Sequence, residues 1–168
     1  NSESLFAGSP IQVHQVLMNL ITNASQAMEI DGGTILISIQ DVTVTQASGP
    51  LEIGLKPGNY IAIAITDTGM GIPVHVLDSI FEPYFTTKPP GKGSGMGLSM
   101  VHGIIEKAGG RITVESEEGK GSTFTVYFPV TASGTEIRPK ISSYVTTRAE
   151  RILFVDDEPT VAEITGRM

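Results

Sequence analysis

The glycine-rich segment at residues 91–105, Gly-Lys-Gly-Ser-Gly-Met-Gly-Leu-Ser-Met-Val-His-Gly-Ile-Ile, constrains the fold of this chain more than any other feature. Its glycines alternate with small or apolar residues and lead directly into an amphipathic helical pattern. Glycines before a helix start let backbone N–H groups approach phosphates closely, and the helix dipole there favours negative charge. The segment lacks the Gly-Lys-Ser/Thr of a P-loop, and no strand leads into it as in a dinucleotide-binding fold. It therefore predicts an anion-binding helix start of a different kind.

Composition and charge exclude several classes of protein. The 168 residues suffice for one domain and a remnant, and no run approaches the ~20 apolar residues of a membrane span. The absence of cysteine rules out disulfides and thiolate metal sites, and no histidine or acid cluster has zinc-site spacing, so we expect no tightly bound transition metal. A net charge of −7 argues against nucleic-acid binding. Binding of an anionic nucleotide would therefore depend on Mg²⁺, backbone amides and a few lysines.

Hydrophobic periodicity predicts a two-layer α/β sandwich, in which one mixed, mostly antiparallel sheet carries about three helices on one face. We expect helices at 10–29, 74–81 and 96–108, and strands at 34–39, 60–65, 111–116 and 122–128. The first two strands would form a hairpin with a long loop, and the last two a hairpin with a tight turn. An edge strand is also expected to begin near residue 5.

The first helix has an unusual polar face that carries no charge. Carboxamide side chains recur there at steps of three and four, at Gln12, Gln15, Asn19, Asn23 and Gln26. A solvated helix face would normally carry Lys and Glu, whereas an amide oxygen is a hard ligand suited to Mg²⁺. From the helix alone, a neutral solvent-facing strip and an Mg²⁺-ATP surface both remain open. The other blocks of the sequence favour the second interpretation.

Asp67 is the strongest single candidate for ligand recognition. It has the same parity as the isoleucines of the 60–65 strand, so it projects from the same sheet face, toward the expected helices. A carboxylate at this strand end can accept a hydrogen bond from the exocyclic amine of adenine, and guanine presents a carbonyl there instead. Gly69 and Gly71 would let the backbone approach the ring. The alternative is an ordinary turn residue in Asp-Thr-Gly.

Four blocks in order resemble the catalytic ATP-binding domain of bacterial sensor histidine kinases. They are the glycine segment and, before it, residues 19–28, 67–73 and 81–88, which read NLITNASQAM, DTGMGIP and FEPYFTTK. The resemblance runs from about residue 12 to residue 129 and implies the Bergerat ATP-binding fold shared by gyrase-, kinase- and MutL-like proteins. Gln26 stands where many such kinases have Lys, and the surrounding motif resembles the nitrogen-regulation-like subgroup.

The resemblance implies a site for ATP and Mg²⁺ within these blocks. Its members would be Asn19, Asn23, Asp67, Gly69, Gly71, Ile72, Lys88, Gly93, Ser94, Gly95, Met96, Gly97, Leu98 and Thr123. Asn23 would hold Mg²⁺, and Asn19 would lie beside the phosphates. Residues 83–95 would form a mobile lid in which Lys88 neutralises phosphate charge. Thr123 would lie near adenine.

The expected activity is phosphoryl transfer rather than hydrolysis. Asn19 stands where gyrase-like ATPases carry the Glu that activates water, and an amide cannot act as a general base. The resemblance implies that the γ-phosphoryl group passes to a histidine on a separate dimerisation domain, absent here, and then to a receiver aspartate of a response regulator. The chain's own histidines, His14, His75 and His102, lack the context of a phosphoacceptor. A hydrolytic Bergerat ATPase and a non-catalytic nucleotide-sensing module are the alternatives.

The remaining segments suggest a fragment of a hybrid kinase. We expect residues 1–9 to end an upstream segment, 10–130 to form the catalytic domain, 131–150 to be a linker, and 151–168 to begin a truncated receiver domain. This last segment resembles the first receiver strand, which ends in paired acids, but it is too short to supply the acceptor aspartate. The domain is expected to face the cytosol as a monomeric fragment of a homodimer, whose membrane attachment stays open.

Overall fold

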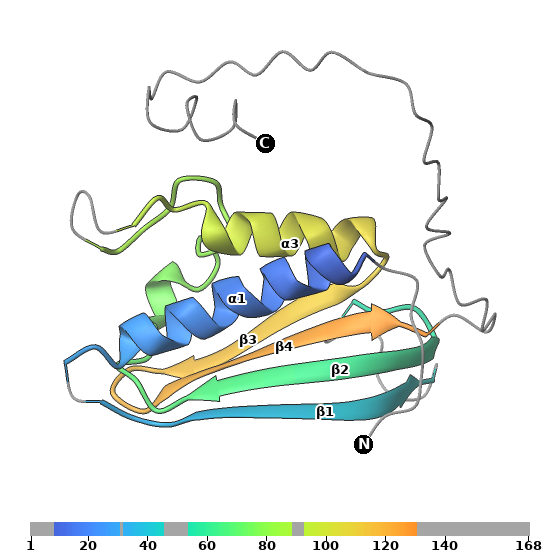
Figure 1. Cartoon of the computed structure of the whole chain (residues 1–168), viewed down its shortest axis with the longest axis horizontal. Coiled ribbons are helices and arrows are strands. Elements are labelled where there is room, and N and C mark those ends of the chain that lie inside the picture. The colour runs from blue at the N-terminus through green and yellow to red at the C-terminus, as the bar shows by residue number, and fades with distance from the viewer. Residues whose placement is uncertain (1–8, 31, 46–53, 89–92, 131–168) are drawn as a thin grey trace, which may run out of the picture. The chain divides into compact units, whose positions relative to one another are not determined.

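The computed structural model describes residues 9–30, 32–45, 54–88 and 93–130. These residues form two layers, a sheet and a helical layer that covers one of its faces (Figure 1). In chain order the elements are α1 (Pro10–Ala27), β1 (Ile35–Val44), β2 (Gly58–Asp67), the 3₁₀ helix η1 (Val74–Val76), α3 (Gly97–Lys107), β3 (Arg111–Glu117) and β4 (Gly121–Pro129). The predicted α/β sandwich with its helices on one face is therefore confirmed.

The sheet has the strand order β1-β2-β4-β3, and each neighbouring pair is antiparallel. The expected mixed sheet is thus antiparallel throughout its described strands. After β2 the chain passes through the helical layer and enters the sheet again at its far edge as β3. It then turns back as β4, which lies between β3 and β2 and is antiparallel to both. In this register Asp67 pairs with Ile35 on one side and with Ser122 on the other.

The two long helices follow from their apolar spacing. In α1, Pro10 occupies the first turn, where a missing N–H costs nothing, and Val16, Leu20 and Ala24 are buried at steps of four. In α3, Val101 and Ile105 are buried in the same way. Among the described residues, no helix has the length and apolar character needed to cross a membrane.

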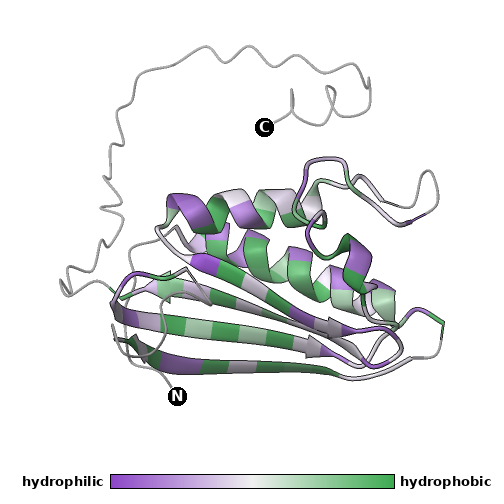
Figure 2. Ribbon diagram, turned by 180° about the vertical axis from the view of Figure 1, so that it is seen from behind, coloured by the Kyte–Doolittle hydropathy of each residue, from purple (hydrophilic) through white to green (hydrophobic). Residues whose placement is uncertain are grey.

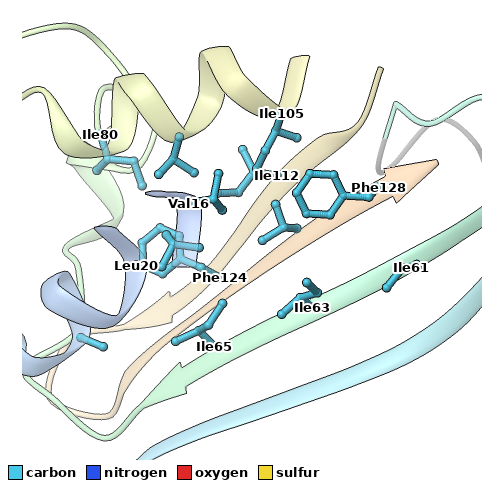
Figure 3. Close-up of a cluster of buried hydrophobic side chains, with 13 residues drawn as sticks. Val16, Leu20, Ile61, Ile63, Ile65, Ile80, Ile105, Ile112, Phe124 and Phe128 are labelled. Carbon is cyan, nitrogen blue, oxygen red and sulfur yellow. The ribbon is translucent and has the colours of Figure 1, made fainter. Parts of the chain in front are cut away.

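The core lies between the two layers (Figure 3). Ile63 and Ile65 of β2 project toward α1, together with Phe124 of β4, and they meet Leu20 and its neighbours on the helix. Each fully buried side chain of this size stabilises the fold by about 1.5–3 kcal/mol. Figure 2 shows strongly apolar residues alternating with weakly apolar or polar ones along the central strands. The sheet face that carries Asp67 is therefore the face that the helices cover.

Three predicted elements differ most from the observed ones. The first two strands are longer than expected, because cross-strand pairing continues from Asp41 with Ile61 to Val44 with Gly58. The helix expected at 74–81 is only the short η1 and subsequent turns, since its backbone bonds close over three residues, as from Leu77 N–H to the Val74 carbonyl. The expected edge strand near residue 5, the linker and the receiver segment lie outside the described residues.

Candidate functional site

Asp67 ends β2 as a buried carboxylate. Its side chain is 3% exposed, and its Oδ1 accepts a hydrogen bond of 2.8 Å from the backbone N–H of Gly69. Asp67 and Ser122, which face each other across β2 and β4, are the polar residues among the buried ones that the structure describes. Burying a charge is costly unless hydrogen bonds compensate for it, so such a group marks a place where a polar ligand can contribute.

The turn after Asp67 is held tightly between two other parts of the fold. The Met70 N–H donates to the Ala27 carbonyl at the end of α1 (3.1 Å), and the Met70 carbonyl accepts from Gly119 N–H in the β3–β4 hairpin (2.7 Å). A Cβ at Gly69 would lie only 2.7 Å from the Ala27 carbonyl oxygen. Gly69 is therefore required for this close approach to α1, whatever its contact with a ligand.

A hydroxyl network extends from this turn to Ser122. Ser116 Oγ donates to the Gly121 carbonyl (3.0 Å) and accepts from the Ile72 N–H (2.8 Å). Ser116 and Ser122 Oγ are 2.9 Å apart. Because the one hydroxyl proton of Ser116 is already donated, Ser122 must be the donor in this pair. The lone pairs of Ser122 Oγ thus stay available to accept a hydrogen bond beside Asp67.

Thr123, which the sequence predicts near adenine, lies on the other face of the sheet. Its Oγ1 lies 3.0 Å from that of Thr66, whose side chain points away from the helices. Ser122 instead shares Asp67's face. The signal was present in the sequence, because Ser122 has the parity of the buried Phe124 and Val126 on the same strand.

The predicted polar face of α1 meets the start of α3. Asn19 is half-buried, and its Nδ2 donates to the Gln15 carbonyl (2.8 Å). A Cβ at Gly97 would lie 2.9 Å from Asn19 Oδ1, so the amide oxygen of Asn19 lies against the first turn of α3. Asn23 is half-buried one turn further along α1, and its side chain makes no hydrogen bond to a residue that the structure describes. Its oxygen is thus free for a ligand.

The structure describes residues 83–88 and 93–95 of the segment expected to form the lid, and a backbone hydrogen bond joins the two ends of this segment. The Tyr84 N–H donates to the Gly95 carbonyl (3.0 Å), and both residues have a positive φ. Phe81 and Phe85 pack against the core, as expected for residues that anchor the segment. Lys88 reaches across to α1, where its Nζ donates to Gln26 Oε1.

The remaining predicted positions belong to the turn after Asp67 or to the segment that leads into α3. Ser94 Oγ accepts from Met96 N–H (3.3 Å) just before α3. Leu98 packs against the core from the first turn of α3, and Ile72 does so from the turn after Asp67. Gly93 lies beside Lys88, close enough that a Cβ there would be 3.2 Å from its Cδ. Asn19 and Asn23 thus lie on α1, and three other segments touch that helix: the start of α3 at Asn19, Lys88 at Gln26, and the Asp67 turn at its C-terminal end.

A hollow of about 330 Å³ borders Asp67 and Ser122 but does not reach the polar face of α1. Thr66, Glu115, Glu117 and Thr123 line it from the sheet face opposite α1. The rest of its lining comes from Asp67, Ser116, Lys120, Gly121 and Ser122. Neither Asn19 nor any other residue of α1 contributes to its lining. We therefore place the candidate site on the helical side of Asp67, along the polar face of α1.

Residues 8–132 match the family described as "Histidine kinase-, DNA gyrase B-, and HSP90-like ATPase". Sensor kinase CckA of Brucella abortus (strain 2308) is 46% identical over 118 residues, which are 70% of this chain and 12% of that protein. Sensor histidine kinase ZraS of Escherichia coli (strain K12) is 44% identical over 121 residues, which are 72% of this chain and 22% of that protein. The chain thus spans less than a quarter of the length of these relatives. The narrower assignment to a nitrogen-regulation-like subgroup stays a prediction.

Solved structures agree with the fold. The catalytic domain of histidine kinase ThkA, in a nucleotide-free form, superposes with a TM-score of 0.58 and 29% sequence identity, covering 78% of this chain and 76% of that one. Mycobacterial sensor histidine kinase MprB gives the same TM-score at 24% identity and 74% coverage of both chains. The two-layer architecture is thus that of histidine kinase catalytic domains.

Proposed function

The chain belongs to the family of histidine kinase-, DNA gyrase B- and HSP90-like ATPases, and we propose that residues 10–130 are the catalytic domain of a sensor histidine kinase. In this role the domain binds Mg²⁺-ATP and donates the γ-phosphoryl group to a histidine on a separate dimerisation domain. The buried Asp67 carboxylate beside Ser122 is the observation that carries the proposal. Within the described core, this pair offers acceptors where the rest of the sheet face is apolar.

Adenine recognition follows from the acceptors at the end of β2. Asp67 Oδ1 already accepts from Gly69 N–H, so the second oxygen of the carboxylate is the acceptor for the exocyclic amine of adenine. Ser122 Oγ retains lone pairs for the same region. Guanine presents a carbonyl in place of the amine, and two facing acceptors repel each other. The pair therefore selects adenine over guanine.

The triphosphate would lie along the polar face of α1. The absence of formally charged side chains from residue 11 to 28 leaves that face without a carboxylate to repel phosphate. The amide oxygen of Asn23 suits Mg²⁺, and a bound Mg²⁺ would supply charge neutralisation for the triphosphate. Asn19 lies where α1 meets the start of α3, so it can orient phosphates between the two helices.

Phosphoryl transfer to a protein acceptor is favoured over hydrolysis. Asn19 is an amide and cannot remove a proton from water. Catalysis by this chain is then mostly positioning of the γ-phosphoryl group for a nucleophile that another domain brings. The proposed partners are the protein's own dimerisation and histidine-phosphotransfer domain and a receiver domain, and the proposed location is the cytosol.

Nucleotide titration tests the proposal directly. Calorimetry with the 168-residue protein and Mg²⁺ should give micromolar to millimolar dissociation constants for ATP and ADP, and much weaker binding of GTP. Equal affinity for ATP and GTP would contradict the adenine site. Rapid release of inorganic phosphate without an added partner would instead identify a hydrolytic ATPase, and the absence of any nucleotide binding would rule out both activities.

A further inference from the structure

We propose that Gln26 is a positioning residue that holds Lys88 over the polar face of α1, where it meets the γ-phosphate of bound ATP. The inference rests on the proposed function, and it concerns a residue that makes no contact with ATP itself. The sequence left the cation at this end of the site in doubt, because Gln26 replaces the Lys found in many related kinases. The structure points to a different source of that positive charge.

The contact that carries the inference joins two distant parts of the chain. Lys88 Nζ donates to Gln26 Oε1, although 62 residues separate them in sequence. Gln26 lies one helical turn beyond Asn23 on the same polar face and about 10 Å along the helix axis from Asn19. The ammonium group of Lys88 is therefore at the end of the row of carboxamides.

Lys88 is also restrained at its backbone. Its N–H donates to Thr86 Oγ1 (3.1 Å), and its side chain is half-buried rather than extended into solvent. A free lysine side chain loses considerable conformational entropy when it binds a ligand. Holding the ammonium group in place beforehand removes part of that loss from the free energy of ATP binding.

The chemistry of an amide suits this positioning role. A lysine ammonium has three N–H donors, so a single bond to Gln26 Oε1 leaves two of them for phosphate oxygens. Because the amide is neutral, it orients Lys88 without cancelling its positive charge, as a carboxylate would. A lysine at position 26 would instead repel Lys88 and displace it.

A double-mutant cycle tests the inference through nucleotide affinity. The variants are Gln26→Ala, Lys88→Ala and their combination in the 168-residue protein, titrated with ATP and with ADP in Mg²⁺. Gln26→Ala should weaken ATP by about three- to tenfold and ADP by less than about twofold, since only ATP has the γ-phosphate. In the Lys88→Ala background, Gln26→Ala should change ATP affinity little. Gln40→Ala on β1 and Lys56→Ala before β2 are the matched controls, because both residues are exposed and neither belongs to α1 or to the segment around Lys88.

Amide hydrogen exchange without nucleotide supplies a second readout. Gln26→Ala should speed exchange at residues 86–88, whereas Gln26→Glu, which keeps an acceptor oxygen, should leave exchange there as it is in the unchanged protein. Additive losses of ATP affinity in the double variant, or unchanged exchange in Gln26→Ala, would overturn the inference while the proposed function stands. If the unchanged protein fails to bind ATP, the proposed function itself is wrong.

Discussion

Asp67 and Ser122 face each other across β2 and β4 on the helical side of the sheet, at 3% and 5% exposure. The pairing brings a carboxylate and a hydroxyl acceptor together at the edge of an apolar core. Hydrogen bonds to the Gly69 N–H and to Ser116 Oγ offset part of the cost of burying them, and each side chain keeps an acceptor for a ligand. This relationship makes the adenine site testable residue by residue.

Asp67→Asn should reduce ATP affinity by roughly ten- to a hundredfold, or about 1.5–3 kcal/mol. Asn keeps the shape and one acceptor for Gly69, but its amide group turns two donors toward a site that needs an acceptor. Calorimetry gives the affinity, and thermal unfolding checks that the fold persists. Asp78→Asn, at an exposed position, is the control. Wild-type-like ATP binding by Asp67→Asn would show that Asp67 does not recognise adenine.

Ser122 and Thr123 should behave oppositely when their hydroxyls are removed. Ser122→Ala should weaken ATP by about fivefold, corresponding to one lost hydrogen bond of about 1 kcal/mol. Thr123→Val breaks the bond to Thr66 on the other sheet face, so it should lower stability slightly and leave ATP affinity unchanged. Paired titration and thermal unfolding separate the two effects. A larger loss of ATP affinity in Thr123→Val than in Ser122→Ala would show that Thr123 is the residue near adenine.

Asn23→Ala should weaken Mg²⁺-ATP much more than metal-free ATP, because only the metal complex uses the amide oxygen as a ligand. Titrations of ATP in Mg²⁺ and in EDTA measure the affinity for the metal complex and for metal-free ATP. Gln40→Ala, on the sheet, is the control for loss of an exposed amide. Equal losses in the two conditions would show that Asn23 is structural.

ATP should slow amide exchange in residues 83–88 and 93–95, because these residues surround Lys88 and the start of α3. Hydrogen exchange with a non-hydrolysable ATP analogue measures this. The core strand β4 serves as an internal reference whose exchange should stay constant. Identical exchange at 83–88 with and without the analogue would argue against a lid.

The isolated chain should not phosphorylate itself. His102 is held between Glu106, at 3.6 Å, and the Phe81 ring, whose centroid is 5.4 Å away, while a phosphoacceptor must reach the γ-phosphate in line at about 3–3.5 Å. Incubation with radiolabelled ATP, with and without the protein's own histidine domain as a separate chain, measures transfer. Label is expected only with the added domain. Stable label on the chain alone would mean that one of its histidines is an acceptor.

Periodicity in the sequence was enough to predict the two long helices, the existence of the described strands and the direction of Asp67, but not the short η1. Helical spacing predicted α1 and α3 to within two residues at each end, and strand parity placed Asp67 on the helical face of β2. These properties are local, because the side-chain periods of helices and strands are fixed by backbone geometry. The order of the four sequence blocks likewise predicted the family.

Which of these residues meet depends on how the strands and helices pack. Ser122 faces Asp67 because β4, and not β3, lies beside β2 in the sheet. In the chain, β2 and β3 are joined by residues of the helical layer, and the local structure of that connection permits either strand order. The bond from Lys88 to Gln26 joins segments 62 residues apart and depends on how the loop before α3 folds back onto α1. Periodicity in the sequence gives the face on which a side chain lies, whereas its neighbours depend on strand order and helix packing over the whole fold.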